Sequence, residues 1–347
     1  MSRPFAAGLA LTLAMAVPAT AQTILTAETS GANTTPGISI IALSEVAAAG
    51  DIADIQVTAG QTLTNSVQNV AEGKTDIAAA PFILPFLLNR GVGPYASLGA
   101  ETGAELAGNL AVLYTYRISA QGLFAYDSAN IGNWDELKGK TLLNGPPRGA
   151  ALTNARLLVQ TVTGLEDGPG YTGIQVNWGQ MQSTIQDGSA DAFVVPMDFP
   201  DPRISAALSS GDMTIYSMPK DVFEGDTFQN VTNLPGTVAF TIPVSDMGYT
   251  NGVTVISEDG TYRGPGTVGG DIVNINMDFE LAKSLTAAFI ANYEKIYHAK
   301  APFMPAVWHG ETDPVLTDMC GPNPLKYHPG AVAAWEEAGY DLPDCAK

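Results

Sequence analysis

The chain has 347 residues, of which 46% are hydrophobic and 15% are charged. This composition excludes an intrinsically disordered chain, and the length predicts about two domains. Sixteen Lys and Arg residues against 35 Asp and Glu residues give a formal net charge of −19. Binding to nucleic acid or to an anionic membrane by charge requires a basic surface, so the sequence predicts neither partner.

The first 21 residues have the three parts of a secretory signal peptide. Arg3 is the positive region, residues 5–17 are apolar, and Ala19-Thr20-Ala21 is a small-residue cleavage motif. We therefore expect cleavage after Ala21 and export to the periplasm, with a buried N-terminal helix as the alternative. Because Arg3 is the only charged residue removed, the mature charge would be −20. Beyond Gln22 no apolar run reaches the ~18 residues that span a bilayer.

Short apolar strands alternate with helices along the mature chain, which indicates an α/β protein with doubly wound parallel sheets. The expected strands are 23–29, 55–59, 76–80, 111–116, 122–126, 141–143, 192–195 and 238–242. The expected helices begin at Pro36, with Thr35 as the cap, and near residue 67, and continue with 150–163, 182–187, 281–296 and 331–338.

Three polar loops, 30–35, 61–66 and 145–149, each follow a strand and precede a helix. In an open α/β sheet such loops face the crevice where ligands bind, and the free N–H groups of helix starts suit anions. Ordinary polar turns are the alternative for any single loop. The ligand-binding groups that we expect are Ser30, Gly31, Asn33, Thr34, Thr62, Asn65, Ser66, Pro81, Gly145, Arg148, Gly149, Ala150, Asp198 and Phe199.

Arg148 is the strongest single candidate among them. A guanidinium group binds a carboxylate through two parallel hydrogen bonds, so we expect Arg148 to hold an acidic ligand. Asp198 would accept a hydrogen bond from an amine or hydroxyl of the ligand, and Phe199 would pack on its apolar part. The alternative for Arg148 is an ion pair with a neighbouring surface carboxylate.

Several motifs that suggest chemistry fail in their context. Residues 264–269 match a dinucleotide fingerprint formally, but no strand precedes them and no helix follows, so we interpret them as a glycine-rich hairpin or hinge loop. Gly73-Lys74-Thr75 and Gly139-Lys140-Thr141 lack the first glycine of a phosphate-binding loop. Ser217 and Lys220 have no partner motif, and the three histidines, expected to be surface or packing residues, form no base–nucleophile pair. The sequence therefore predicts no enzyme and no cofactor.

Two cysteines, Cys320 and Cys345, lie near the C-terminus. In an oxidising compartment we expect them to form a disulfide, which would close a loop of about 25 residues and stabilise the fold by about 3 kcal/mol. The alternatives are free thiols or a metal pair. His309 and His328 flank Cys320 without the spacing of a zinc site, so no metal is expected.

Several segments together resemble the TAXI-type solute receptors of TRAP (tripartite ATP-independent periplasmic) transporters. The segments are 62–69, 72–78, 137–141, 187–193 and 327–339. The resemblance implies a two-lobed periplasmic binding protein, type II-like and monomeric, whose doubly wound sheets are joined by crossing strands. It also implies a small carboxylate ligand, glutamate or dicarboxylate-like, and a TRAP permease with fused large and small subunits. The third loop departs from the family, because Pro146-Pro147-Arg148 replaces a Gly- and Ser-rich segment.

We expect residues 22–117 plus 240–347 to form one lobe and residues 118–239 the other, with closure around a ligand. Two rival interpretations stay open. One is an exported α/β enzyme, a hydrolase or lyase. The other is a receptor of the same fold that serves an ATP-driven transporter or a sensor kinase.

Overall fold

The computed structural model describes residues 22–232, 234–293, 295, 319–321 and 323–347. The expected signal peptide, His298 and His309 lie outside these residues. The strands are β1 (Thr23–Glu28), β2 (Ala53–Thr58), β3 (Ile77–Pro81), β4 (Leu110–Tyr126), β5 (Thr141–Leu143), β6 (Thr172–Ile174), β7 (Ala192–Met197), β8 (Met213–Tyr216), β9 (Thr237–Pro243), β10 (Val253–Ile256) and β11 (Thr261–Asn274). The helices are α1 (Thr35–Ala49), α2 (Leu63–Ala71), α3 (Ile83–Arg90), α4 (Gly99–Gly108), α5 (Ala150–Thr163), α6 (Trp178–Gln186), α7 (Pro202–Ala207), α8 (Lys220–Glu224), α9 (Asp226–Thr232), α10 (Phe279–Asn292) and α13 (Pro329–Glu337).

The described strands form one mixed sheet of eleven strands, with the main order β2-β1-β3-β11-β4-β7-β5-β6. Strand pairing is parallel toward both ends, between β1 and its neighbours β2 and β3 and between β5 and its neighbours β6 and β7. In the centre, β11 is antiparallel to β3 and β4, and β4 is antiparallel to β7. Parallel neighbours need crossover connections, and helices supply most of them.

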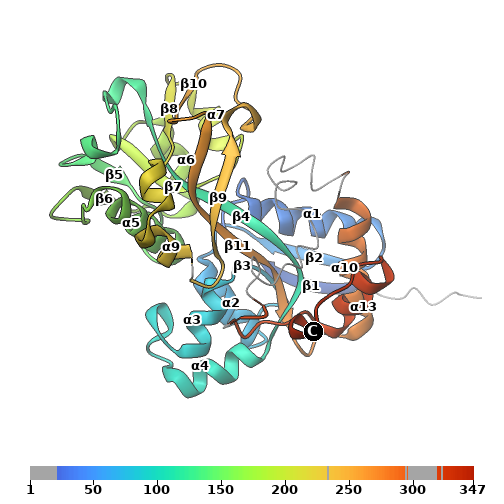
Figure 1. Cartoon of the computed structure of the whole chain (residues 1–347). Coiled ribbons are helices and arrows are strands. Elements are labelled where there is room, and N and C mark those ends of the chain that lie inside the picture. The colour runs from blue at the N-terminus through green and yellow to red at the C-terminus, as the bar shows by residue number, and fades with distance from the viewer. Residues whose placement is uncertain (1–21, 233, 294, 296–318, 322) are drawn as a thin grey trace, which may run out of the picture.

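Two long strands run through both halves of the molecule (Figure 1). β4 has 17 residues and β11 has 14, and they pair from Gly266–Ala120 to Asn274–Leu110. The sequence predicted two strands where β4 is one, because Arg117 and Gln121 interrupt its apolar pattern. The expected fold class, two α/β lobes joined by crossing strands, is confirmed. The lobes share the crossing strands, so the hydrogen-bonded sheet is continuous.

The glycine-rich segment 264–269 lies inside β11, so the expected hairpin or loop is wrong. A Cβ atom on Gly269 would lie 2.2 Å from the carbonyl oxygen of Ala80, and one on Gly270 would lie 2.3 Å from that of Tyr114. These two glycines therefore allow the close approach of neighbouring strands. A strand that continues through the motif is not the strand–turn–helix unit that binds a dinucleotide.

The hydrophobic cores show how the lobes divide. One core combines β1, β2, β3, α1, α10 and α13 with one end of the crossing strands. Two further cores lie in the second lobe, and Phe240, Met247 and Tyr262 belong to one of them. β10 also pairs with β8 of that lobe. The lobe boundaries remain a proposal, and this packing supports extending the second lobe from residue 239 to about residue 266.

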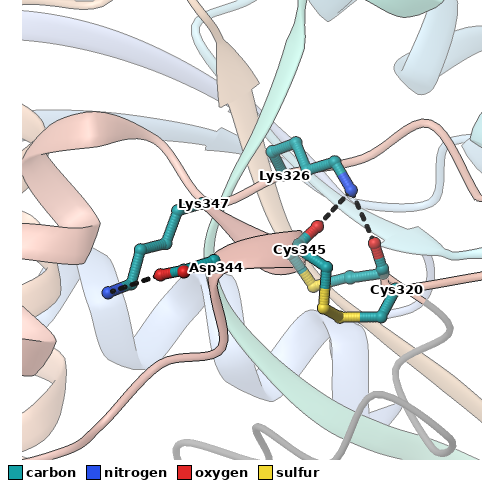
Figure 2. The surroundings of a disulfide bond; sticks show 6 residues. Cys320, Lys326, Asp344, Cys345 and Lys347 are labelled. Carbon is teal, nitrogen blue, oxygen red and sulfur yellow. Dashed lines mark hydrogen bonds and ion pairs between the residues drawn. A yellow bond between two sulfur atoms is a disulfide. The ribbon is translucent and has the colours of Figure 1, made fainter.

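The C-terminal segment is fixed to the first lobe. Cys320 and Cys345 form the expected disulfide, and the Lys326 ammonium donates to the carbonyl oxygens of Met319 and Cys345 beside it (Figure 2). The backbone N–H of Val112 in β4 donates to the Lys326 carbonyl at 2.9 Å. His328 is a packing residue as expected, because it is buried and its Nδ1 accepts from Gly330 N–H at the start of α13.

Candidate functional site

A cavity of about 70 Å³ lies where the two lobes meet. Ile118 and Ser119 of β4 and Thr267 of β11 line it, so the crossing strands form part of its surface. A site needs on the order of 10–15 Å³ of such volume for one water. The cavity therefore has room for several waters or for one small solute.

The first-lobe wall consists of uncharged groups, among them the predicted residues Ser30, Thr34, Thr62 and Pro81. Ser30 Oγ and Thr34 Oγ1 lie 2.8 Å apart and form a hydrogen bond. Thr34 Oγ1 also accepts from Gly37 N–H, so Thr34 caps α1 and the expected cap at the next residue is wrong by one position.

Thr35, the first residue of α1, contacts the other lobe instead. Its hydroxyl donates to Asp198 Oδ1 at 2.8 Å. Asp198 follows β7 in the second lobe, and both residues are buried at the cavity. This hydrogen bond therefore joins the two lobes across the site.

The second-lobe wall includes the predicted residues Arg148, Gly149 and Ala150. α5 spans 150–163 as the sequence predicted, and Gly149 before it has φ +103°, a conformation that favours glycine. Arg148 is exposed at the cavity, and the described part of the chain offers its guanidinium no hydrogen bond or ion pair. The alternative of a surface ion pair for Arg148 thus has no support among these residues.

A charged cluster lies deeper in the same wall. Asp201 caps α7 by accepting from Arg203 N–H at 2.7 Å, and it also binds Arg203 Nε at 3.0 Å and Nη2 at 2.6 Å. The backbone N–H of Asp198 donates to Asp201 Oδ2 at 3.2 Å. The Asp201–Arg203 pair therefore fixes the loop that presents Asp198 to the cavity.

Burial raises the pKa of Asp198 to about 7. The neighbouring negative charge of Asp201 raises this pKa further, and the hydrogen bond from Thr35 and the charge of Arg203 oppose the shift. Asp198 is consequently a carboxyl group that gains or loses its proton near neutral pH.

Two polar atoms of cavity-lining residues are buried and have no hydrogen-bond partner among the described residues: Arg203 Nη1 and Thr64 Oγ1. Sequence reasoning did not identify Arg203. It follows Asp201 and Pro202, a helix cap and a helix-opening proline after a buried strand, and the start of α1 after loop 30–35 has the same pattern. Trp178 and Asn154 also line the cavity, and their sequence context gave no such signal.

Six predicted site residues lie outside the cavity lining: Gly31, Asn33, Asn65, Ser66, Gly145 and Phe199. The two asparagines are exposed, while Ser66 is fully buried within α2. The Phe199 ring stacks on Phe240 at a centroid distance of 5.7 Å and therefore belongs to the second-lobe core. Position in a loop does not reveal which way a side chain points or how it packs, so loop position alone did not identify the residues that line the cavity.

The residues that the structure describes contain no cluster of three His, Cys, Asp or Glu side chains that could hold a metal ion. Within the same ranges, no helix combines the length and the apolar composition that a membrane crossing requires.

The fold and the cavity define a two-lobed α/β protein of the solute-binding class, with its site between the lobes. The chain belongs to the NMT1-like family, whose model matches residues 24–339. No curated protein matches the chain.

Solved structures with a similar fold include three periplasmic or import-system binding proteins. A TRAP periplasmic solute-binding protein from Chromohalobacter salexigens, with bound (S)-(+)-2-amino-1-propanol, has a TM-score of 0.47 and 13% identity, over 91% of this chain and 90% of its own. The ligand-binding component of an ABC-type import system from Staphylococcus aureus has a TM-score of 0.45 and 10% identity, over 86% of this chain and 83% of its own. The aliphatic sulphonate-binding protein SsuA from Escherichia coli has a TM-score of 0.42 and 12% identity, over 82% of each chain.

Proposed function

We propose that the protein is a periplasmic receptor of the TAXI type, which captures a small carboxylate between its lobes and delivers it to an ion-gradient-driven TRAP permease. The observation that carries this proposal is the Arg148 guanidinium, which lies at the cavity without a protein partner among the described residues. The proposal includes export by the N-terminal segment, a monomeric receptor and a ligand that is glutamate or dicarboxylate-like.

The local charge at Arg148 outweighs the net charge of the chain. Charges more than about 8–10 Å away are largely screened at physiological salt, whereas a guanidinium binds a carboxylate at contact with two hydrogen bonds. The N–H groups at the start of α5, at Gly149 and Ala150, add donors in the same place. An acidic protein can therefore bind an acidic ligand at this point.

An exported enzyme is the main rival. No described residue that lines the cavity is a histidine or cysteine, and no lining serine has a basic partner. A purified receptor should return a bound solute chemically unchanged, whereas conversion of the solute would support the enzyme. Transport by the receptor and its permease in vesicles should follow an imposed ion gradient without ATP. A requirement for ATP would instead favour the receptor of an ATP-driven transporter.

Native mass spectrometry of the freshly purified protein should identify a co-purified small acid. With that acid, Arg148→Ala should weaken binding in isothermal titration by about 2–4 kcal/mol, because a desolvated carboxylate loses its partner. Arg90→Ala is the matched control, since Arg90 lies on α3 against Phe86 and outside the cavity lining. An unchanged dissociation constant for Arg148→Ala would contradict the assignment of Arg148 to the binding site.

Closure around the ligand is a separate expectation. Small-angle scattering should show a more compact particle with the identified acid than without it. Identical profiles would contradict a closing receptor.

A further inference from the structure

One corner of the cavity, formed by Asp198 and Arg203, is still incompletely hydrogen-bonded. Asp201 accepts from Nε and Nη2 of Arg203, and Nη2 also donates to the Pro196 carbonyl. Within the described ranges, Nη1 is the nitrogen of this guanidinium without a partner. Of the residues that the structure describes, only Thr35 donates hydrogen bonds to the Asp198 carboxyl, although a carboxylate can accept about four. Arg203 is only 6% exposed and Asp198 only 7%, so bulk water does not satisfy these groups.

The facing wall of the first lobe also contains a buried polar group without a hydrogen-bond partner among the described residues. Thr64 in α2 lines the cavity, and its buried hydroxyl has no partner in the described part of the chain. A Cβ atom placed on Gly149 would lie 3.5 Å from Thr64 Oγ1, so the two walls approach each other here. Buried polar groups in native proteins are nearly always hydrogen-bonded. Unsatisfied groups on both walls of one cavity therefore point to a ligand that satisfies them.

We infer that the ligand carries, besides its carboxylate, a neutral group that both donates and accepts, a hydroxyl or a primary amide, bound between Asp198 and Arg203. This inference rests on the proposed function, because it takes the carboxylate at Arg148 as given. It narrows the proposed ligand class as well, because it favours hydroxy acids and amide acids over glutamate and simple dicarboxylates. It also assigns Arg203 to the binding site.

The alternatives satisfy only one side of this corner. An ammonium group donates to Asp198 but cannot accept from Arg203 Nη1, and the guanidinium repels it. A second carboxylate accepts from Arg203 but cannot donate to a charged Asp198, which repels it. Only a protonated Asp198 could donate to it. A methyl group does neither and would leave both protein groups unpartnered.

The test compares straight-chain carboxylates of three to six carbons whose far end carries a hydroxyl, a primary amide, an ammonium, a carboxylate or a methyl group. Isothermal titration at pH 8, where Asp198 is charged, gives the dissociation constant of each with the unaltered protein. At the best-fitting chain length, the hydroxyl or amide acid should bind at least about tenfold more tightly than the other three.

The outcomes separate the inference from the proposed function. Tightest binding by the ammonium, carboxylate or methyl acid would overturn the inference and leave the carboxylate receptor intact. Equal binding of all five would also overturn it, because the corner would then not contact the ligand. Binding by none of the acids would overturn the proposed function, and the inference with it.

Asp198→Asn provides a second measurement, because it removes the charge of the side chain but keeps its size and its ability to form hydrogen bonds. The amide oxygen can still accept from Thr35, and the amide nitrogen can donate to a ligand carboxylate. The advantage of the hydroxyl acid over the dicarboxylate should therefore fall at least about tenfold. Asp135→Asn, at an exposed position outside the cavity lining, is the control and should leave the ratio unchanged. An unchanged ratio in Asp198→Asn would contradict the inference.

Discussion

The two walls of the cavity differ in charge. The first-lobe wall offers hydroxyl groups of Ser30, Thr34 and Thr64, whereas the second-lobe wall holds Arg148, Asp198 and Arg203. Neutral hydroxyls tolerate several ligand orientations, because each can donate or accept. Charged groups fixed by an ion pair impose one arrangement. We therefore expect the second lobe to determine which ligand binds and the first lobe to complete the enclosure.

Two buried carboxyl groups, one in each lobe, differ in how completely their hydrogen bonds are satisfied. Asp271 of β11 lies in the first lobe and accepts from Tyr114 Oη at 2.5 Å, Tyr116 Oη at 2.7 Å and Ser39 Oγ at 3.0 Å. Burial raises its pKa to about 6, and the three hydrogen bonds oppose this shift. Asp198 has a hydroxyl partner only from the opposite lobe. Asp271 is thus a structural group with satisfied partners, whereas Asp198 is the carboxyl group that we propose binds a ligand.

The largest expected effect is that of Asp271→Ala. Removing the carboxyl leaves three buried hydroxyls without their acceptor, so the free energy of unfolding should fall by about 3–5 kcal/mol in urea. The surviving folded protein should bind its acid with unchanged affinity. A loss below about 1 kcal/mol would mean that the hydroxyls find other partners and would weaken the contrast with Asp198.

Loss of the disulfide should affect the stapled first lobe and spare binding. Cys345→Ser, or Cys320→Ser, should lower the free energy of unfolding by about 3 kcal/mol, because the cross-link restricts the unfolded chain. Ligand affinity should remain as in the unaltered protein. In that protein, thiol labelling without reductant should modify neither cysteine, and labelling of both would refute the bond.

Asp198→Asn should stabilise the protein in a pH-dependent way. The pKa of Asp198 is about 7 when folded and about 3.9 when unfolded. Its protonation therefore stabilises the fold less as pH rises from about 4 through 7, and at pH 8 the fold holds a buried charge. The variant should melt several degrees higher at pH 8 and show no gain at pH 4. Asp271→Asn should gain less at pH 8, because the folded pKa of Asp271 is raised only to about 6 and its carboxylate accepts three hydrogen bonds that the amide would disturb.

The smallest effect is expected for Thr35→Val. This nearly isosteric change removes the hydrogen bond to Asp198 and should shift the ligand-free protein toward an open form by about 0.5–1.5 kcal/mol. Scattering should then report a larger radius of gyration than for the unaltered protein. Thr286→Val is the control, because that buried hydroxyl bonds within α10 to Ala282. An equal change in both variants would mean that the bond across the lobes does not favour closure.

Local sequence signals predicted the elements around the site well. Helix 150–163 and strand 141–143 have the expected bounds, because a glycine-rich loop separates short strand and helix patterns. The same signals failed at β11, where glycines look like a turn but lie in a strand. Glycine frees the backbone in either case, and only the neighbouring strands show which use applies.

The sequence by itself determined the α/β class, the loops that face the crevice, and the candidate carboxylate ligand of Arg148. Each depends on residues close together in the chain, where periodicity and turn chemistry act locally. The tertiary structure decided that Thr35 bonds to Asp198, a residue 163 positions away, and that Arg203 belongs to the cavity. It also showed that Ser66 and Phe199 are buried away from the cavity. Contacts between distant segments arise only when two lobes pack on shared strands, and no local pattern records them.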